Sequence, residues 1–122
     1  MNEKTKKTVV VVAGKPNVRK YLKSLVKCAG GVVIHEESRG GPAKKIIEDK
    51  QPALLVTDIA LDNEGLTGLD LAILVNIPTV LVRYNLLWRN GVSYIAQSGG
   101  RIYPCDLSDS KRIVDTIRDC LA

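Results

Sequence analysis

The chain has 122 residues, which suits a single domain, 1–122, that can bury a hydrophobic core. Apolar residues make up 45% and charged residues 25%, values typical of a soluble globular domain that exclude a disordered or membrane-spanning chain. The formal net charge is +5, but the basic residues are scattered along the sequence. We therefore expect no nucleic-acid or membrane partner.

The first third of the chain predicts a buried strand, a helix and a second strand. Residues 1–7 form a polar stretch that we expect to be a flexible lead-in. Residues 8–13 are all Val, Thr or Ala, as in a strand buried on both faces. Pro16 suits a first helical turn, and Gly30-Gly31 would end the helix. Its apolar residues recur at helical spacing: Val18, Leu22, Leu25, Val26 and Ala29. Residues 32–34 predict the second strand.

The middle of the chain repeats this alternation. Gly40-Gly41-Pro42 leads into a helix with Ala43, Ile46 and Ile47 on its apolar face, and Pro52 closes it. Residues 53–58 predict a third strand, and residues 69–76 allow barely two turns of helix.

The last third contains two more strand and helix pairs. Residues 77–84 predict the fourth strand, 86–97 a less regular helix, and 100–103 a short fifth strand. Ser108 is a good N-cap for the last helix, whose apolar face contains Ile113, Ile117 and Leu121. Strands that alternate with helices throughout predict an α/β domain with a parallel sheet covered on both faces.

The three cysteines, Cys28, Cys105 and Cys120, are far apart and lack metal-binding spacing. They predict neither a disulfide framework nor a zinc site, which is consistent with a reducing cytoplasm.

Several segments resemble the response-regulator receiver domain. The β-branched run 8–12 leads into a turn, the stretch Leu54–Ile59 contains an aspartate at the strand end, and Gly68 and Ile77-Pro78 follow in the receiver order. This resemblance implies a flavodoxin-like, doubly wound, five-stranded parallel sheet of order 2-1-3-4-5. It also implies a site beyond the carboxyl ends of strands one and three.

The departures from the receiver pattern fall at that site. Asp58 matches the phosphoacceptor, but Ala13, Gly14 and Lys15 stand where the family has its acidic metal-binding residues. With one carboxylate left, we expect no Mg²⁺ and no other cofactor.

The family's switch residues also differ. The resemblance places Arg83 and Tyr84 at the switch at the end of strand four, and Tyr103-Pro104 at the Lys-Pro of strand five. Because the matching bond in receivers is characteristically cis, we predict a cis bond between Tyr103 and Pro104. We predict that Arg83 and Lys15 lie near Asp58 and neutralise its charge.

Other polar and aromatic residues leave alternatives open. Asp62 or Glu64 could replace the missing metal ligands, although solvated turn residues are the simpler interpretation. His35 has no catalytic arrangement around it and is interpreted as a surface residue. Trp88 and Tyr94 are candidates for interface anchors.

These observations favour a non-catalytic, cytoplasmic pseudo-receiver that acts through a protein partner, with a homodimer left open. No residue is predicted to be catalytic. One alternative is an atypical phosphorelay receiver phosphorylated on Asp58. Another is a flavodoxin-like module that binds a small anion or nucleotide through Gly14, Lys15 and Arg83.

Overall fold

The computed structural model describes residues 7–62, 65–83 and 100–122. Some sequence predictions lie outside these ranges. They are the flexible lead-in up to residue 6, the helix at 86–97, Glu64 as a metal ligand, Tyr84 as a switch residue, and Trp88 and Tyr94 as interface anchors.

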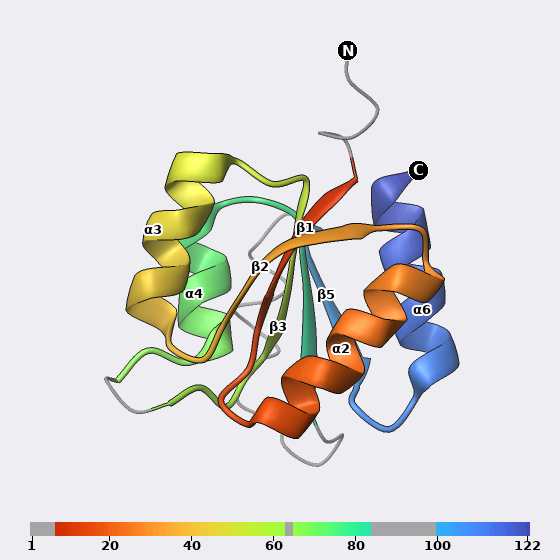
Figure 1. The fold of residues 1–122 in the computed structure, drawn as a ribbon, viewed down its shortest axis with the longest axis horizontal. Helices are drawn as coiled ribbons and strands as arrows, with labels where there is room; N and C mark the ends of the chain where they lie inside the picture. The colour runs from red at the N-terminus through yellow and green to blue at the C-terminus, as the bar shows by residue number, and fades with distance from the viewer. Residues whose placement is uncertain (1–6, 63–64, 84–99) are drawn as a thin grey trace.

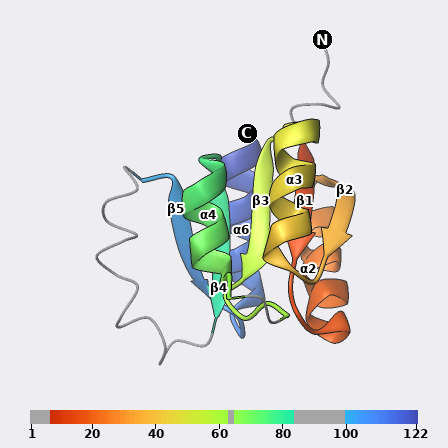
Figure 2. The same ribbon diagram turned by 90° about the vertical axis from the view of Figure 1, so that its left-hand side faces the viewer.

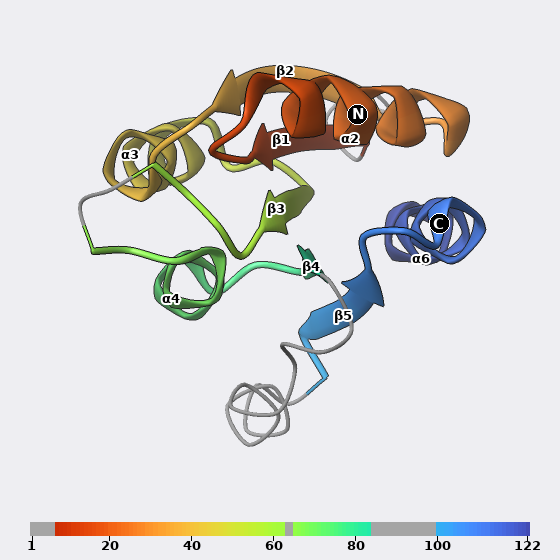
Figure 3. The same ribbon diagram turned by 90° about the horizontal axis from the view of Figure 1, so that it is seen from below.

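Five parallel strands form one sheet of order β2-β1-β3-β4-β5, as predicted. Figure 3 shows this order looking from one end of the sheet. Reversal of the strand order beside β1 creates a switch point between the carboxyl ends of β1 and β3. The strands are β1 (Thr8–Val12), β2 (Val32–Glu37), β3 (Leu54–Asp58), β4 (Thr79–Arg83) and β5 (Ile102–Asp106).

Helices cover both faces of the sheet, as the alternation of strands and helices predicts. Helices α2 and α6 lie on one face, and α3 and α4 lie on the other (Figures 1 and 3). Figure 2 shows α3 and α4 in front of the sheet. The helices are α2 (Pro16–Cys28), α3 (Gly40–Lys50), α4 (Gly68–Val75) and α6 (Ser110–Leu121). None of these described helices is long and apolar enough to cross a membrane.

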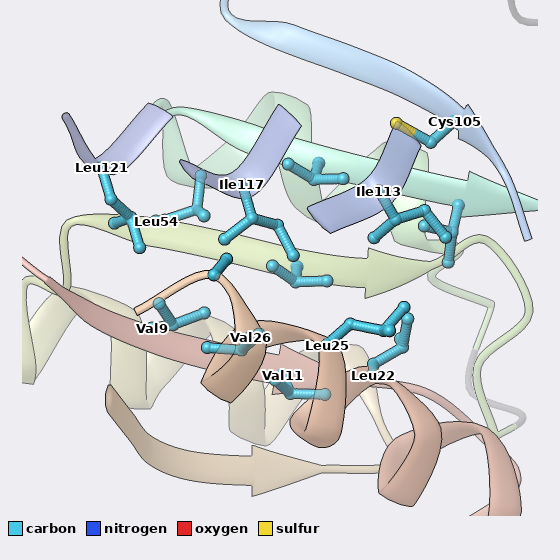
Figure 4. Packing of buried hydrophobic residues seen from close by; sticks show 14 of the residues in the cluster. Val9, Val11, Leu22, Leu25, Val26, Leu54, Cys105, Ile113, Ile117 and Leu121 are labelled. Atoms are coloured by element: carbon cyan, nitrogen blue, oxygen red, sulfur yellow. The ribbon is translucent and has the colours of Figure 1, made fainter. Parts of the chain in front are cut away.

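The larger core lies between the sheet and helices α2 and α6. Figure 4 shows Leu22 and Val26 of α2 facing Ile117 of α6 across the side chains of the central strands. Residues Val9–Val12 of β1 are fully buried, so alternate side chains enter the cores on opposite faces. The run of valines is therefore explained by burial on both faces of a central parallel strand.

Several predicted boundaries shift in the structure. Strand β2 continues to Glu37, three residues beyond the predicted end, so His35 lies inside the strand and not at its end. Helix α3 already begins at Gly40, with Pro42 in its first turn. The N-cap of α6 is Asp109 and not Ser108, because the Asp109 side chain accepts a hydrogen bond from the backbone N–H of Arg112.

The prediction for strand five was wrong in position. Strand β5 runs through Pro104 to Asp106, and the structure contains no cis bond before Pro104 or elsewhere in the described residues. Pairing with β4 continues to the register Arg83↔Asp106, which requires an extended chain at Pro104. Strand β5 is an edge strand, where proline is tolerated because one side of the strand needs no N–H donors.

Candidate functional site

The carboxyl ends of four strands meet at one edge of the sheet, where backbone hydrogen bonds tie the following loops together. The N–H of Gly14 donates to the carbonyl of Ala60 (3.1 Å), and that of Leu107 donates to the carbonyl of Arg83 (2.9 Å). A cavity of about 190 Å³ opens between these loops. Its lining residues are Lys15, Asn17, Val18, Asp58, Ile59, Ala60, Arg83 and Leu107. This cavity lies at the switch point, the position predicted for the site.

Asp58 is the buried carboxyl group of this cavity. It ends β3, and its side chain is almost enclosed, with the residue 8% exposed. Burial raises the pKa of Asp58. Hydrogen bonds from the backbone N–H groups of Ala60 and Ile59, then the charges of Arg83 and Lys15, pull the pKa down without cancelling the effect of burial. The Asp58 carboxyl group therefore holds its proton more tightly than a solvated aspartate.

Two cationic residues share the cavity with Asp58. Arg83 is the last residue of β4, and Lys15 precedes the first turn of α2. Burial lowers the pKa of Arg83 while Asp58 raises it, but a guanidinium keeps its proton at neutral pH. The structure thus brings Asp58, Arg83 and Lys15 together, as expected. The predicted neutralisation of a charged Asp58 is not what the structure favours, because desolvation raises the pKa of Asp58 by more than the two cations lower it.

Ala13 and Gly14 bring no charge to this edge of the sheet. Ala13 is fully buried, and a Cβ atom on Gly14 would lie 3.1 Å from Oδ1 of Asp62 and 3.2 Å from the carbonyl oxygen of Ala60. The backbone carbonyls of both residues face Arg19 of α2, which donates to Ala13 (2.8 Å) and Gly14 (3.3 Å). A guanidinium therefore caps the turn in which the receiver pattern has carboxylates.

Gly68 packs directly against the backbone of Asp58. A Cβ atom on Gly68 would lie 2.0 Å from the carbonyl oxygen of Asp58, far inside any allowed contact. The N–H of Gly68 also donates to the carbonyl of Ile59 (2.9 Å). Helix α4 can approach the end of β3 this closely only because its first residue lacks a side chain.

The residues around Asp58 do not supply the oxygen ligands of a Mg²⁺ site. Mg²⁺ prefers carboxylate, phosphate and water oxygens, but the charged residues that line the described cavity are one carboxylate and two cations. Asp62 is exposed, with its carboxylate against Gly14. Within residues 7–62, 65–83 and 100–122, no three His, Cys, Asp or Glu side chains gather as a metal site would need.

The end of β5 contributes Asp106 and Leu107, which the sequence analysis missed. Asp106 is the register partner of Arg83, whereas Tyr103 pairs with Val80, three residues before the site. Oδ1 of Asp106 accepts hydrogen bonds from the N–H (2.9 Å) and hydroxyl group (2.7 Å) of Ser108. A signal was present in the sequence: short loops between strands and helices would place the strand end shortly before the cap at Asp109.

Tyr103 and Pro104 instead line a second cavity, of about 260 Å³, between β5 and α6. Cys120 is at its edge, and burial raises the pKa of this thiol to about 11. A thiol with so high a pKa is a poor nucleophile at neutral pH. This second cavity therefore gives no sign of covalent chemistry.

His35 is half-buried within β2. Its Nε2 atom lies 3.3 Å from Oε1 of Glu37, two residues along the strand. This contact lies on the far side of β1 from β3 and Asp58. The structure thus gives His35 a local polar partner and no role at the cavity.

The sequence matches no family model and no curated protein. Solved structures do resemble this chain. The signal receiver domain of an HD domain-containing protein from Pseudomonas fluorescens Pf-5 has a TM-score of 0.79 and 11% identity, with 96% of this chain and 88% of that one covered. A LuxR-family DNA-binding response regulator from Staphylococcus aureus has a TM-score of 0.77 and 19% identity, with 95% and 99% covered.

The signal receiver domain of the response regulator NarL from Mycobacterium tuberculosis has a TM-score of 0.72 and 18% identity, with 93% of this chain and 94% of that one covered. These comparisons, together with the strand order, establish that the chain has the receiver-domain fold, a flavodoxin-like arrangement of five parallel strands.

Proposed function

We propose that this protein is a non-catalytic regulatory module that acts through contacts with a protein partner and without aspartyl phosphorylation. The observation that carries the proposal is the charge of the cavity at the switch point. It combines one buried carboxyl group, Asp58, with two cations, Lys15 and Arg83.

This arrangement opposes phosphoryl transfer to Asp58 in two ways. Mg²⁺ would have to enter a cavity in which Lys15 and Arg83 repel it, and only Asp58 would supply a charged ligand. The attacking group must also be an ionised carboxylate, whereas burial favours the protonated form of Asp58. A module with this cavity would instead regulate through its surface.

The resemblance to response-regulator receiver domains supports a signalling role of this kind. We extend it to this chain as a proposal, together with a cytoplasmic location. One of the similar proteins is described as DNA-binding. For this chain we propose a protein partner instead, because its basic residues do not form a single patch along the sequence.

The test is incubation with a small phosphodonor and Mg²⁺, followed by intact-mass measurement. We expect no species heavier by one phosphoryl group. The Asp58→Asn variant is the matched control, because it keeps the size of the side chain and removes the acceptor oxygen. A mass increase in the wild-type protein that disappears in Asp58→Asn would establish the alternative, an atypical receiver phosphorylated on Asp58.

Partner binding is tested separately with the full chain as bait in a lysate of the source cell. The proposal requires at least one protein to be retained equally by the wild-type protein and by Asp58→Asn. A partner retained only after phosphodonor treatment of the wild-type protein would contradict a role that is independent of phosphorylation.

A further inference from the structure

We propose that the cavity between Lys15, Arg83 and the first turn of α2 binds a small tetrahedral oxyanion, such as sulfate or phosphate, without forming a covalent bond. The inference deepens the proposed function, because it rests on this cavity being free of a metal ion and a phosphoryl group. It gives the same pocket a reversible ligand.

The size of the cavity selects the class of ligand. Pockets for drug-sized molecules and cofactors occupy roughly 300–1,000 Å³. The cavity here measures about 190 Å³, which is sufficient for a tetrahedral ion with some bound water but too small to enclose a nucleotide. Of the two ligand classes that the sequence analysis left open, the structure therefore favours the small anion.

Three groups on separate elements provide attraction for an anion. Lys15 and Arg83 supply two positive charges from the β1–α2 loop and the end of β4. Asn17 belongs to the first turn of α2, where the helix dipole is positive. Pro16 has no N–H and the N–H of Val18 donates to the carbonyl of Lys15 (3.1 Å), so the Asn17 N–H is the backbone donor that this turn offers an anion. That turn has no acidic residue and no side-chain cap, so no side chain in it competes with an anion.

Asp58 makes the affinity depend on pH. As a carboxylate it would repel the anion, whereas as a neutral acid it would donate a hydrogen bond to it. Four other acids of the described residues are near this end of the sheet. Glu36 and Glu37 end β2, where Glu36 pairs with Arg19 and Lys23 and Glu37 contacts His35. Asp62, in the loop after β3, is beside Gly14, and Asp106, at the end of β5, accepts two hydrogen bonds from Ser108. Because burial raises the pKa of Asp58, anion affinity should increase as the pH falls.

The experiment uses sodium sulfate with EDTA, compared with sodium chloride at equal ionic strength. Sulfate is suitable because it stays a dianion in mildly acidic and mildly basic buffers. Thermal shift and calorimetry should show saturable binding that is stronger in the acidic buffer. Phosphate at one pH should give a similar shift, as expected of a site that recognises tetrahedral oxyanions.

Three variants make the test specific. Lys15→Ala should weaken sulfate binding by about tenfold, the loss expected for one hydrogen bond to a charged group. Lys20→Ala is the matched control: it removes an exposed lysine of α2, outside the cavity, and should bind as the wild-type protein does. Asp58→Asn should bind roughly tenfold more tightly in the basic buffer and lose the pH dependence.

Two results would overturn the inference: no saturable sulfate binding, or binding that is equally strong in Lys15→Ala and in the wild-type protein. These failures are distinct from failure of the proposed function. The sulfate experiment contains no Mg²⁺, no phosphodonor and no lysate. The proposed function fails instead by a mass increase on Asp58, by a partner that requires phosphorylation, or by retention of no partner.

Discussion

Replacement of Gly68 by alanine should destabilise the protein, although alanine is the better helix former. Gly68 is the first residue of α4, and helix propensity alone would favour Gly68→Ala by up to about 1 kcal/mol. In the structure, however, the new methyl group would lie 2.0 Å from the carbonyl oxygen of Asp58 and 3.0 Å from Cα of Ile59. Both contacts are with backbone atoms, so no side chain can rotate away.

The magnitude follows from these opposing effects. Relief of the contact requires α4 to move about 1 Å from the end of β3, which would stretch the hydrogen bond between Gly68 and Ile59. Overpacking of this kind costs up to about 3 kcal/mol. After the gain in helix propensity is subtracted, we expect a net loss of about 2 kcal/mol in the free energy of unfolding.

Urea unfolding followed by far-ultraviolet circular dichroism measures this loss. For a domain of this size, a loss of about 2 kcal/mol should lower the midpoint by roughly 1 M urea. Gly41→Ala in α3 is the matched control, because its new methyl group would point into open space, with no atom beyond its own stretch of helix within 4 Å. This control should be as stable as the wild-type protein or slightly more stable. A Gly68→Ala variant that equals or exceeds the wild-type stability would refute the close packing of α4 against Asp58.

Three further results are expected around Asp58. Asp58→Asn should stabilise the protein at neutral pH by about 1 kcal/mol, because it removes a buried charge. Since burial raises the folded-state pKa of Asp58 above its ordinary value of 3.8, this group favours folding at acidic pH and loses that contribution as the pH rises through the raised pKa. The urea midpoint of the wild-type protein should fall as the pH rises through this pKa, and it should fall less in Asp58→Asn. An equal dependence of the midpoint on pH in the two proteins would argue against a buried carboxyl group. Arg83→Ala should destabilise the fold by about 1–3 kcal/mol, and the double variant with Asp58→Asn should recover part of this loss; strictly additive effects would mean that the two side chains do not interact. Calorimetry should detect no Mg²⁺ binding at concentrations on the order of millimolar, and clear heat of binding there would restore Asp58 as a metal-assisted acceptor.

The arrangement of the domain could be predicted from the sequence because its signals are local. The valines of β1 have the composition of a strand buried on both faces, and Pro16 and Gly30-Gly31 mark the limits of α2. Alternation of such strands and helices restricts the topology to a few parallel arrangements. The same local pattern placed Asp58 at the end of β3 and Ala13 after β1. The resemblance to receiver domains then indicated, before the structure was known, that uncharged residues stand where that pattern has an acidic pair.

The register of β5 could not be predicted in this way. It is a short edge strand, and in the sequence alone Pro104 suggests that the strand ends before this residue. Pairing with β4 decides instead that the strand runs on and that Asp106 is the residue beside Arg83. Register depends on hydrogen bonds between segments far apart in the chain, which no local pattern contains.

Tertiary structure alone also decided the chemical state of the site. The sequence placed Arg83 and Lys15 near Asp58, and from this we predicted a neutralised carboxylate. The structure adds the depth at which Asp58 is buried, and there desolvation outweighs both cations and raises its pKa. The sequence specifies which charges meet, but the balance between their attraction and the loss of water depends on packing from every neighbouring element.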